Sequence, residues 1–431
     1  MKKVLIIADL FHASPRIPGL AKYLPEFGWQ PIILTTPIGE KSDSRFGPPD
    51  DFRKNNRVIE TYGYHSRKDV ELRPKKRLKK YGYIRTLLRN VVPFSVRKFL
   101  YRRYSEIVHY PDAEKGWKPF AVKAGDELLQ NEDIDAMISS SSPVTTHIVA
   151  HEFKDKYNVP WVADFRDLWT QNHNYPYSKL RKVFEKRLEL KTLSTADALV
   201  TLSSPAAEKL RMLHKEKRVY TITNGFDPDI MSDGKVNLTS IFTITYTGQI
   251  YSGKQDPSKI LIALKNLISP GAIDPNHVEV RFYGPENGLL QKEIEKYGLS
   301  NIVKQYGTIS RKTSFEKQRE SQLLLLLNWE DPREKGVYTG KIFEYLAAQR
   351  PILVTGGFGN DVVKELLDET NSGVYCSTVE EIKNALTDFY MEYKLKGRVK
   401  CKGNVENINK YSYREIARKF TGILDNLAER G

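Results

Sequence analysis

Short apolar segments recur along the chain, and segments with helical spacing lie between them. In the first half, the apolar segments lie at residues 2–8, 31–36, 135–140, 159–164, 196–203 and 218–223. Their apolar residues are continuous rather than alternating with polar ones, which is typical of parallel strands buried on both faces. Helical spacing follows the third segment, at residues 146–157. This order predicts a parallel sheet covered by helices on both faces.

The pattern restarts in the second half of the chain. Further apolar segments lie at residues 241–248, 278–284, 301–307, 322–328 and 351–356, again with helical segments between them. A chain of 431 residues is too long for one hydrophobic core. The two series therefore predict an α/β protein with two Rossmann-like, doubly wound domains.

The predicted domain boundary lies at residues 224–237, where Gly, Pro, Asp and Ser cluster. We expect an N-terminal domain at 1–223 and a C-terminal domain at 224–405. The final segment, 406–431, contains a strongly amphipathic run that predicts a C-terminal helix. The first domain is interrupted by a polar stretch, read as a loop, and then by a basic insertion at about 66–105.

The charge of the chain is uneven. The net charge is +15, and residues 71–103 carry twelve Lys or Arg against one acid. Apolar residues recur near helical spacing in this segment, between Tyr81 and Val92. A solvated helix and contact with an anionic membrane through Arg73–Arg103 both fit the pattern. Nucleic acid is the weaker alternative, because no recognition motif accompanies the charge.

Other features limit the possible classes. No apolar run approaches the roughly 20 residues that span a bilayer. The apolar start of the chain is short and interrupted by Asp9, so we expect no signal peptide and a cytoplasmic protein. Cys376 and Cys401 are far apart and have no zinc-ligand spacing. Two Asp-x-Asp patterns occur, at 133–135 and 227–229, but neither ends a predicted strand, so no metal site is expected.

Candidate ligand-binding residues follow the strands of the second domain. In a doubly wound sheet, ligands bind beyond the carboxyl ends of the strands. Gly248, with Gln249 after it, follows the segment at 241–247, and Gly284 follows the segment at 278–283. Small residues at these points let a ligand approach the backbone.

A Thr-Gly-Lys triplet, Thr339–Lys341, opens a predicted helix in this domain. Thr339 or Gly340 can cap the helix, and the unpaired amides of a helix start attract anions. Lys341 adds a full charge, and Glu344 follows one turn later, where a carboxylate can accept hydrogen bonds from ribose hydroxyls. The combination suits a nucleoside diphosphate. An ordinary helix cap with a surface ion pair is the structural alternative.

Other candidates have open alternatives. Lys254 lies on the loop after Gly248, where it could neutralise the same diphosphate or be a solvated lysine. Asp164, Arg166, Asp167 and Trp169 cluster at a strand end of the first domain, which favours a functional role. Ser142 and His147 follow another strand. His147 could be an acceptor-side ligand or a histidine on a helix surface.

These motifs resemble the glycosyltransferase group 1 family (family four), whose members are retaining and have the GT-B fold. The resemblance rests on seven separated motifs in order, at residues 8–36, 111–125, 141–147, 160–169, 222–227, 246–254 and 340–353. It implies two domains that face a central cleft, with a C-terminal helix that crosses back to the first domain. It also implies that the first domain binds the acceptor and the second the donor.

The resemblance extends to the site residues. It places Gly248, Gln249, Lys254, Gly284, Thr339, Gly340, Lys341 and Glu344 on the donor side, and Pro15, Arg16, Ser142, His147, Asp167 and Trp169 on the acceptor side. Lys254, Asp164 and Arg166 are the catalytic candidates.

Two residues depart from the family pattern. Gln249 stands where the family often has Arg, so Lys254 must carry more of the phosphate charge. Gly336 stands where the first of two glutamates is common, and that glutamate commonly touches the sugar in relatives.

The sequence thus predicts transfer of a sugar from a nucleotide-diphosphate sugar to an acceptor hydroxyl, with retention and without metal or cofactor. Cell-envelope polysaccharide or glycolipid assembly is the expected setting, with the protein either free in the cytoplasm or peripheral at the inner face of the membrane. The alternatives are a sugar-nucleotide epimerase or hydrolase on the same fold, and a non-catalytic relative that binds membranes or nucleic acid.

Overall fold

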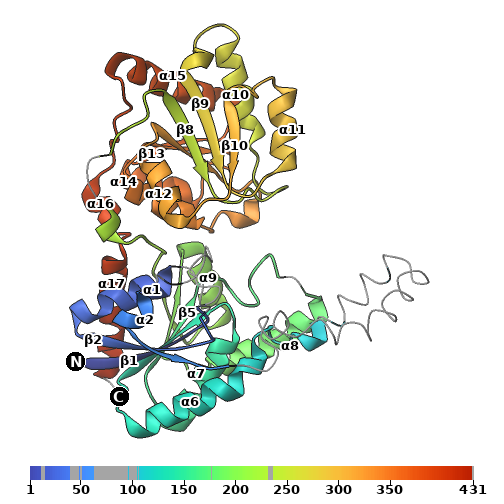
Figure 1. The fold of residues 1–431 in the computed structure, drawn as a ribbon. Coiled ribbons are helices and arrows are strands. Elements are labelled where there is room, and N and C mark those ends of the chain that lie inside the picture. Colours follow the sequence, from blue (N-terminus) through green and yellow to red (C-terminus); the bar gives the residue numbers. More distant parts are fainter. Residues whose placement is uncertain are drawn as a thin grey trace, which may run out of the picture. The chain divides into compact units, whose positions relative to one another are not determined.

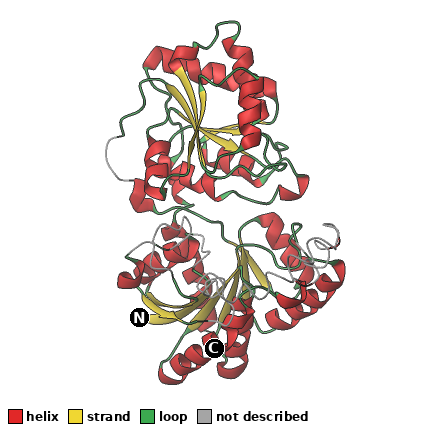
Figure 2. Ribbon diagram, turned by 45° about the vertical axis from the view of Figure 1, so that its right-hand side comes forward, coloured by secondary structure: helices red, strands yellow, loops and turns green. Residues whose placement is uncertain are grey.

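The computed structural model describes residues 1–10, 15–38, 48, 51–62, 96, 104, 106–175, 177–231 and 236–429. The chain divides into two compact units. Unit 1 comprises Met1–Leu202, Ala206–Ile222 and Ala417–Gly431, and unit 2 comprises Ser203–Pro205 and Thr223–Ile416. Each unit is built on one parallel sheet flanked by helices (Figure 1, Figure 2).

Unit 1 contains a seven-stranded parallel sheet in the order β3-β2-β1-β4-β5-β6-β7. The strands are β1 (Lys2–Ala8), β2 (Trp29–Thr35), β3 (Arg57–Glu60), β4 (Ala136–Ser141), β5 (Trp161–Phe165), β6 (Ala198–Thr201) and β7 (Arg218–Thr221). The six predicted strands of this half are confirmed. The edge strand β3 was missed, because it is short and its residues are only partly buried.

The α-helices of unit 1 are α1 (Arg16–Tyr23), α2 (Phe52–Asn55), α6 (Lys118–Asn131), α7 (Thr145–Tyr157), α8 (Lys179–Leu193) and α9 (Ser204–Leu213), with short 3₁₀ helices at Leu24–Phe27 and Lys115–Trp117. Helices α6 and α7 pack closely at Gly125, which has no side chain. A Cβ atom at this position would lie only 2.0 Å from the Phe153 ring. The C-terminal helix α17 (Tyr413–Ala428) starts in unit 2, and its residues from Ala417 onward group with unit 1. Its Asp425 pairs with Lys2 at 2.7 Å.

Unit 2 contains a six-stranded parallel sheet in the order β10-β9-β8-β11-β12-β13. The strands are β8 (Phe242–Thr247), β9 (Val278–Tyr283), β10 (Val303–Gly307), β11 (Leu323–Leu327), β12 (Ile352–Thr355) and β13 (Gly373–Cys376). The five predicted strands of this half are confirmed. The edge strand β13 was missed, because its four residues include only one that is fully buried.

The α-helices of unit 2 are α10 (Ser258–Ile268), α11 (Gly288–Lys296), α12 (Arg311–Arg319), α13 (Gly340–Ala348), α14 (Val362–Thr370), α15 (Val379–Lys396) and α16 (Val405–Asn409), with 3₁₀ helices at Pro228–Met231, Pro275–His277 and Pro332–Glu334. Buried Ile, Leu and Val side chains of β8, β9 and β11 form the centre of the core. Because β8 pairs with β9 and β11, the loops that follow these strands meet at one edge of the sheet.

Apart from Val96 and Tyr104, the predicted basic insertion lies outside the described residues, and so does the helical spacing predicted between Tyr81 and Val92. Among the described helices, none combines the length and the hydropathy that crossing a bilayer requires.

Candidate functional site

Two glycine loops lie against each other at the carboxyl edge of the unit 2 sheet. The Gly248 amide donates to the Tyr283 carbonyl oxygen at 2.6 Å, and the Gly284 amide donates to the Gly307 carbonyl oxygen at 2.8 Å. A Cβ atom on Gly284 would lie 2.2 Å from the Gly248 oxygen. No side chain fits there, so glycine at 284 is required by the contact between the two loops.

Lys341 lies across the first of these loops. A Cβ atom on Gly248 would lie 2.4 Å from Lys341 Cε, and Gly248 has a φ of +108°, which disfavours any side chain. The Lys341 Nζ atom donates to the Gln249 carbonyl oxygen at 3.3 Å and lies 5.1 Å from the centre of the Tyr246 ring. The glycine thus makes the space in which the lysine reaches the end of β8.

Partial burial changes the ionisation of this lysine. Desolvation lowers the pKa of Lys341 to about 8, and the Glu344 carboxylate offsets part of the shift. The protein therefore holds a cation that is poorly solvated and incompletely neutralised. A bound anion would stabilise its charged form.

The start of α13 lies beside this cation. Of the two candidates for the N-cap, Thr339 occupies that position, with extended backbone angles, but its side chain makes no capping hydrogen bond. Within the described part of the chain, its buried Oγ1 atom has no hydrogen-bond partner. The first amides of a helix have no partner inside the helix, so the end of α13 carries partial positive charge next to Lys341.

Glu344 lies one turn into α13. Its Oε1 atom is 3.6 Å from the Arg311 guanidinium, and its Oε2 atom accepts a long bond from Gln318 Nε2 at 3.5 Å. Gln318 also donates to Thr247 Oγ1 at 2.9 Å, which ties the carboxylate to the end of β8. The side chain remains about one third exposed, so its oxygens can accept further hydrogen bonds.

Lys254 has a partner that the sequence analysis missed. Its Nζ atom lies 3.3 Å from Glu334 Oε1, and this carboxylate is almost fully buried. Glu334 lies two residues before Gly336, the position at which the resemblance implies a glutamate, so its position in the sequence was the available signal. The Lys254 side chain is itself about one third exposed and lies 6.0 Å from the Trp329 ring centre.

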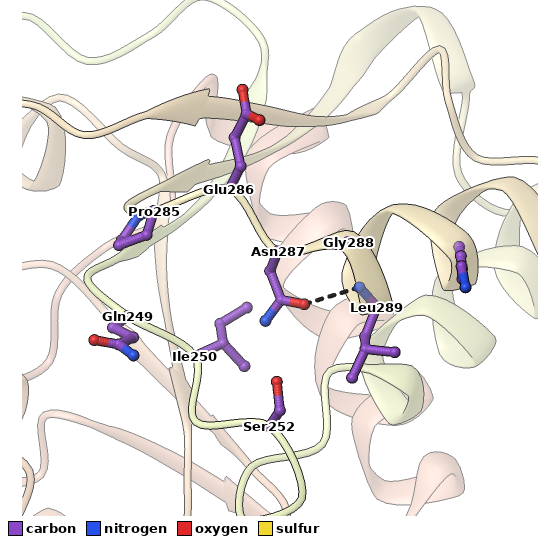
Figure 3. A pocket seen from close by; sticks show the side chains of 9 residues that line it. Gln249, Ile250, Ser252, Pro285, Glu286, Asn287, Gly288 and Leu289 are labelled. Carbon is purple, nitrogen blue, oxygen red and sulfur yellow. Dashed lines mark hydrogen bonds between the residues drawn. The ribbon is translucent and has the colours of Figure 1, made fainter. Parts of the chain in front are cut away.

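A pocket of about 490 Å³ lies between the β8–α10 loop and the start of α11 (Figure 3). Its wall includes Gln249, Ser252 and Asn287. The Asn287 Oδ1 atom accepts from the Leu289 and Leu290 amides at 3.0 and 3.1 Å, which leaves its amide nitrogen as the donor. Gln249 belongs both to this pocket and, through its carbonyl oxygen, to the lysine contact described above.

In unit 1, Arg16 and Asp164 form a fully buried ion pair. The Arg16 Nε and Nη2 atoms donate to the two carboxylate oxygens at 3.0 and 2.8 Å, and Ser140 Oγ donates to the same carboxylate at 2.8 Å. The pair joins the start of α1 to the ends of β4 and β5. Neither side chain is exposed, and the pair holds the start of α1, next to the half-exposed Pro15, against the strand ends.

His147 is also buried. Its Nδ1 atom is 2.7 Å from Ser139 Oγ, and its ring packs 4.6 Å from the Phe165 ring centre. Burial lowers the pKa of His147 to about 3, so the imidazole is neutral at pH 7. The alternative that His147 lies on a helix surface is wrong, because its side chain has no exposed area.

The remaining acceptor-side candidates lie on the two loops that follow β4 and β5. Ser142 and Asp167 are more exposed. Arg166 Nε donates to the Ser141 carbonyl oxygen at 3.0 Å, and its Nη2 atom donates to the Ser142 carbonyl oxygen. Trp169 is buried and donates to Glu185 at 3.0 Å. The structure therefore brings Arg166 and Ser142 together but directs Trp169 into the protein.

Two buried carboxylates of α8 hold this second loop, and the sequence analysis missed them. Glu185 accepts from Trp169, and Glu189 accepts from the Thr170 amide at 3.1 Å and from the Thr170 hydroxyl at 2.5 Å. Their spacing of four residues in an otherwise basic helix was the only signal.

Residues 93–230 match the model described as Glycosyltransferase Family 4. No curated protein matches the sequence significantly.

Solved structures match along the whole chain. A glycosyltransferase from Rickettsia africae has a TM-score of 0.64 at 14% identity, with 100% of this chain and 99% of that chain covered. A sucrose-phosphate synthase from Thermosynechococcus elongatus has a TM-score of 0.60 at 12% identity, with both chains covered completely.

The chain has the GT-B fold. A third solved structure that matches this chain is an Anabaena protein in complex with UDP-glucose. Its TM-score is 0.58 at 11% identity, with 99% of this chain and 100% of that chain covered. The predicted GT-B architecture and the predicted resemblance to group 1 glycosyltransferases are therefore confirmed.

Proposed function

We propose that the protein transfers a sugar from a nucleotide-diphosphate sugar to an acceptor hydroxyl with retention. The observation that carries this proposal is the placement of Lys341 across Gly248 at the start of α13, with Glu344 one turn later. An anion site followed by a carboxylate one helical turn later suits the diphosphate and the ribose of one nucleotide. The GT-B fold supports the same assignment.

In this proposal, the diphosphate lies against Lys341 and the first amides of α13. Lys254 contributes a second cation, because Gln249 cannot supply one. Glu344 accepts hydrogen bonds from the ribose hydroxyls. The tight packing of Gly284 against Gly248 fixes the loop that carries these contacts.

We propose that these cations replace a metal ion and that no cofactor takes part. As the bond to the sugar breaks, negative charge grows on the leaving phosphate, and fixed cations stabilise that charge. With retention, the acceptor attacks the face from which the phosphate leaves. The leaving phosphate itself can then take the acceptor proton, so no protein base is required.

We further propose a polysaccharide or lipid-linked acceptor of the cell envelope, reached by a cytoplasmic protein at the inner face of the membrane. Support comes from the net charge of +15 and from its concentration in Arg73–Arg103, where an anionic surface would be attracted. Arg166, Asp167 and Ser142 are the accessible groups proposed to orient the acceptor or the sugar.

Single substitutions test the donor assignment. We expect Lys341→Ala and Lys254→Ala each to lower kcat by about 10²- to 10³-fold, because each removes a cation from the leaving group. Lys364→Ala is the matched control, since Lys364 lies on α14 and pairs with Asp368. Near-normal rates for both site variants, with intact circular dichroism spectra, would show that the phosphate assignment is wrong.

The products distinguish the alternatives. Nucleotide release that requires an acceptor supports transfer, whereas release or isomerisation of the donor without an acceptor indicates a hydrolase or an epimerase. Absence of turnover with a panel of UDP- and GDP-sugars would favour a non-catalytic relative.

A further inference from the structure

Helix α8 buries charged side chains and exposes large apolar ones, which reverses the usual arrangement. Its buried positions include Arg181, Glu185 and Glu189, which recur every four residues along one face. A surface helix usually buries an apolar stripe and exposes its charges. In α8, by contrast, charged groups form much of the buried face.

The buried charges are satisfied within unit 1. Arg181 Nε pairs with Glu185 Oε1 at 2.5 Å, and its two Nη atoms donate to three backbone carbonyl oxygens of the segment 106–111. Glu189 accepts from Thr170, as described above. The polar face is therefore fixed against the unit, and the helix cannot turn to bury its apolar side chains without breaking these bonds.

The exposed face of α8 carries large apolar side chains. The exposed fractions are 69% for Leu180, 51% for Val183, 50% for Phe184 and 39% for Leu190. These positions follow helical spacing, so they form one stripe along a helix that lies on the outside of unit 1 (Figure 1). Ile107 adds a further apolar side chain that is 75% exposed, on a segment bonded to the first turn of α8.

The exposed charges of α8 itself have a single sign. The exposed and partly exposed residues of α8 include five cations, Lys179, Lys182, Lys186, Arg187 and Lys191. The two acids of α8 are both buried. Over its 15 residues, the outer face of the helix is thus apolar and positively charged, with no carboxylate of its own to neutralise it.

We propose that this face, the exposed residues of Lys179–Leu193, docks on an anionic lipid bilayer. Leu180, Val183 and Phe184 would insert at the boundary of headgroups and acyl chains, while the lysines and arginine contact lipid phosphates. A lipid surface fits better than nucleic acid, because aliphatic side chains between the cations have no partner on a phosphodiester backbone. The surface lies in unit 1, whereas the proposed donor residues lie in unit 2, and it does not include Arg73–Arg103.

The buried face of α8 gives the docking surface a link to the acceptor side. Glu185 and Glu189 hold the loop with Trp169 and Thr170, which follows β5. A bilayer bound to the outer face would therefore lie against the helix that positions this loop. This link is of use to an enzyme whose acceptor is a lipid, and to that extent it rests on the proposed function.

Vesicle sedimentation of the full chain tests the proposal. We expect binding to vesicles of phosphatidylglycerol and phosphatidylcholine, and little binding to phosphatidylcholine alone. Leu180→Gln with Phe184→Gln should weaken binding by at least tenfold, because two apolar side chains are lost from the interface. Lys186→Gln with Arg187→Gln should weaken it by about 25-fold, at roughly fivefold for each cation.

The matched control is Met391→Gln with Leu395→Gln. These residues are 52% and 78% exposed and also lie four residues apart, but on α15 of unit 2. All variants keep residues 71–103, so binding by that segment is common to them. Wild-type-like sedimentation of both α8 variants, or failure of the wild type to bind anionic vesicles, would overturn the proposal. Loss of nucleic-acid binding instead of vesicle binding would also overturn it.

A second readout separates this proposal from the transfer reaction. Nucleotide release with a soluble acceptor should be unchanged in the α8 variants, because the substituted side chains are exposed and none of them belongs to the proposed donor or acceptor residues. Normal release with lost vesicle binding supports the docking surface. Normal vesicle binding with no release from any donor would leave the surface intact and refute only the proposed function.

Discussion

At the scale of single residues, the ionisation of Lys341 connects the structure with a measurable pH dependence. Its pKa is lowered to about 8 because it is partly desolvated at the end of β8. The charged form therefore costs free energy in the folded protein below pH 8. The folded protein loses the proton as pH rises through about 8, whereas the unfolded chain keeps it until about 10.5. The contribution of Lys341 to the free energy of unfolding therefore rises with pH between these two values.

Donor capture should show the opposite trend. A diphosphate needs the charged lysine, so we expect kcat/KM for the donor to fall as pH rises through about 8. Lys341→Arg should be less active but should lose this fall, because a guanidinium stays charged. Initial rates from pH 6.5 to 9.5 at low donor concentration measure both profiles. The same fall in both proteins would assign the titration to another group.

Residue types and spacing predicted the start of α13, and hence Thr339, Lys341 and Glu344, because helix caps and strand ends are local features. The burial of individual polar side chains could not be predicted from the sequence. Arg16, Asp164 and His147 are polar residues of motif segments, and no local pattern indicates that they lie inside unit 1. Their partners come from distant strands and helices.

At the scale of secondary structure, α8 shows where pattern reasoning fails. Periodicity alone would place Leu180, Val183 and Phe184 in a core, since they form the apolar stripe of the helix. In the structure these three side chains are exposed. The opposite face of α8 is buried instead, because Arg181 bonds there to Glu185 and to the Glu106 carbonyl oxygen, a distant partner that the spacing of apolar residues does not reveal. The long central strands were predictable because their apolar runs are continuous, whereas β3 and β13 are short edge strands.

The buried pair in α8 should stabilise unit 1. We expect Glu185→Leu to lower the free energy of unfolding by about 3–5 kcal/mol, because it leaves the buried Arg181 guanidinium without its counter-charge and Trp169 without its acceptor. Urea denaturation followed by circular dichroism measures the change. Glu380→Leu is the control, because the exposed Glu380 carboxylate pairs with Lys383 at the surface of α15. This substitution should change the free energy of unfolding by less than about 1 kcal/mol. Equal effects of the two substitutions would contradict the importance of the buried pair.

At the scale of the whole molecule, the order of strands and helices specified two parallel α/β units, and the order of short motifs specified the fold. Three solved structures with 11–14% sequence identity to this chain share that fold, with TM-scores of 0.58–0.64. The sugar and the acceptor depend instead on individual side chains. Gly336 departs from the pattern that the resemblance implies, and this departure removes the most direct sequence signal for the identity of the proposed sugar.

All the predicted donor residues lie in unit 2, so nucleotide binding can be measured without an acceptor. The most direct test is calorimetric titration of the full chain with UDP and with GDP in the presence of EDTA. We expect at least one of them to bind without a divalent ion, and Lys341→Ala to weaken that binding by tenfold or more. Binding that needs a divalent ion, equal binding by the variant, or no binding of either nucleotide would contradict the account.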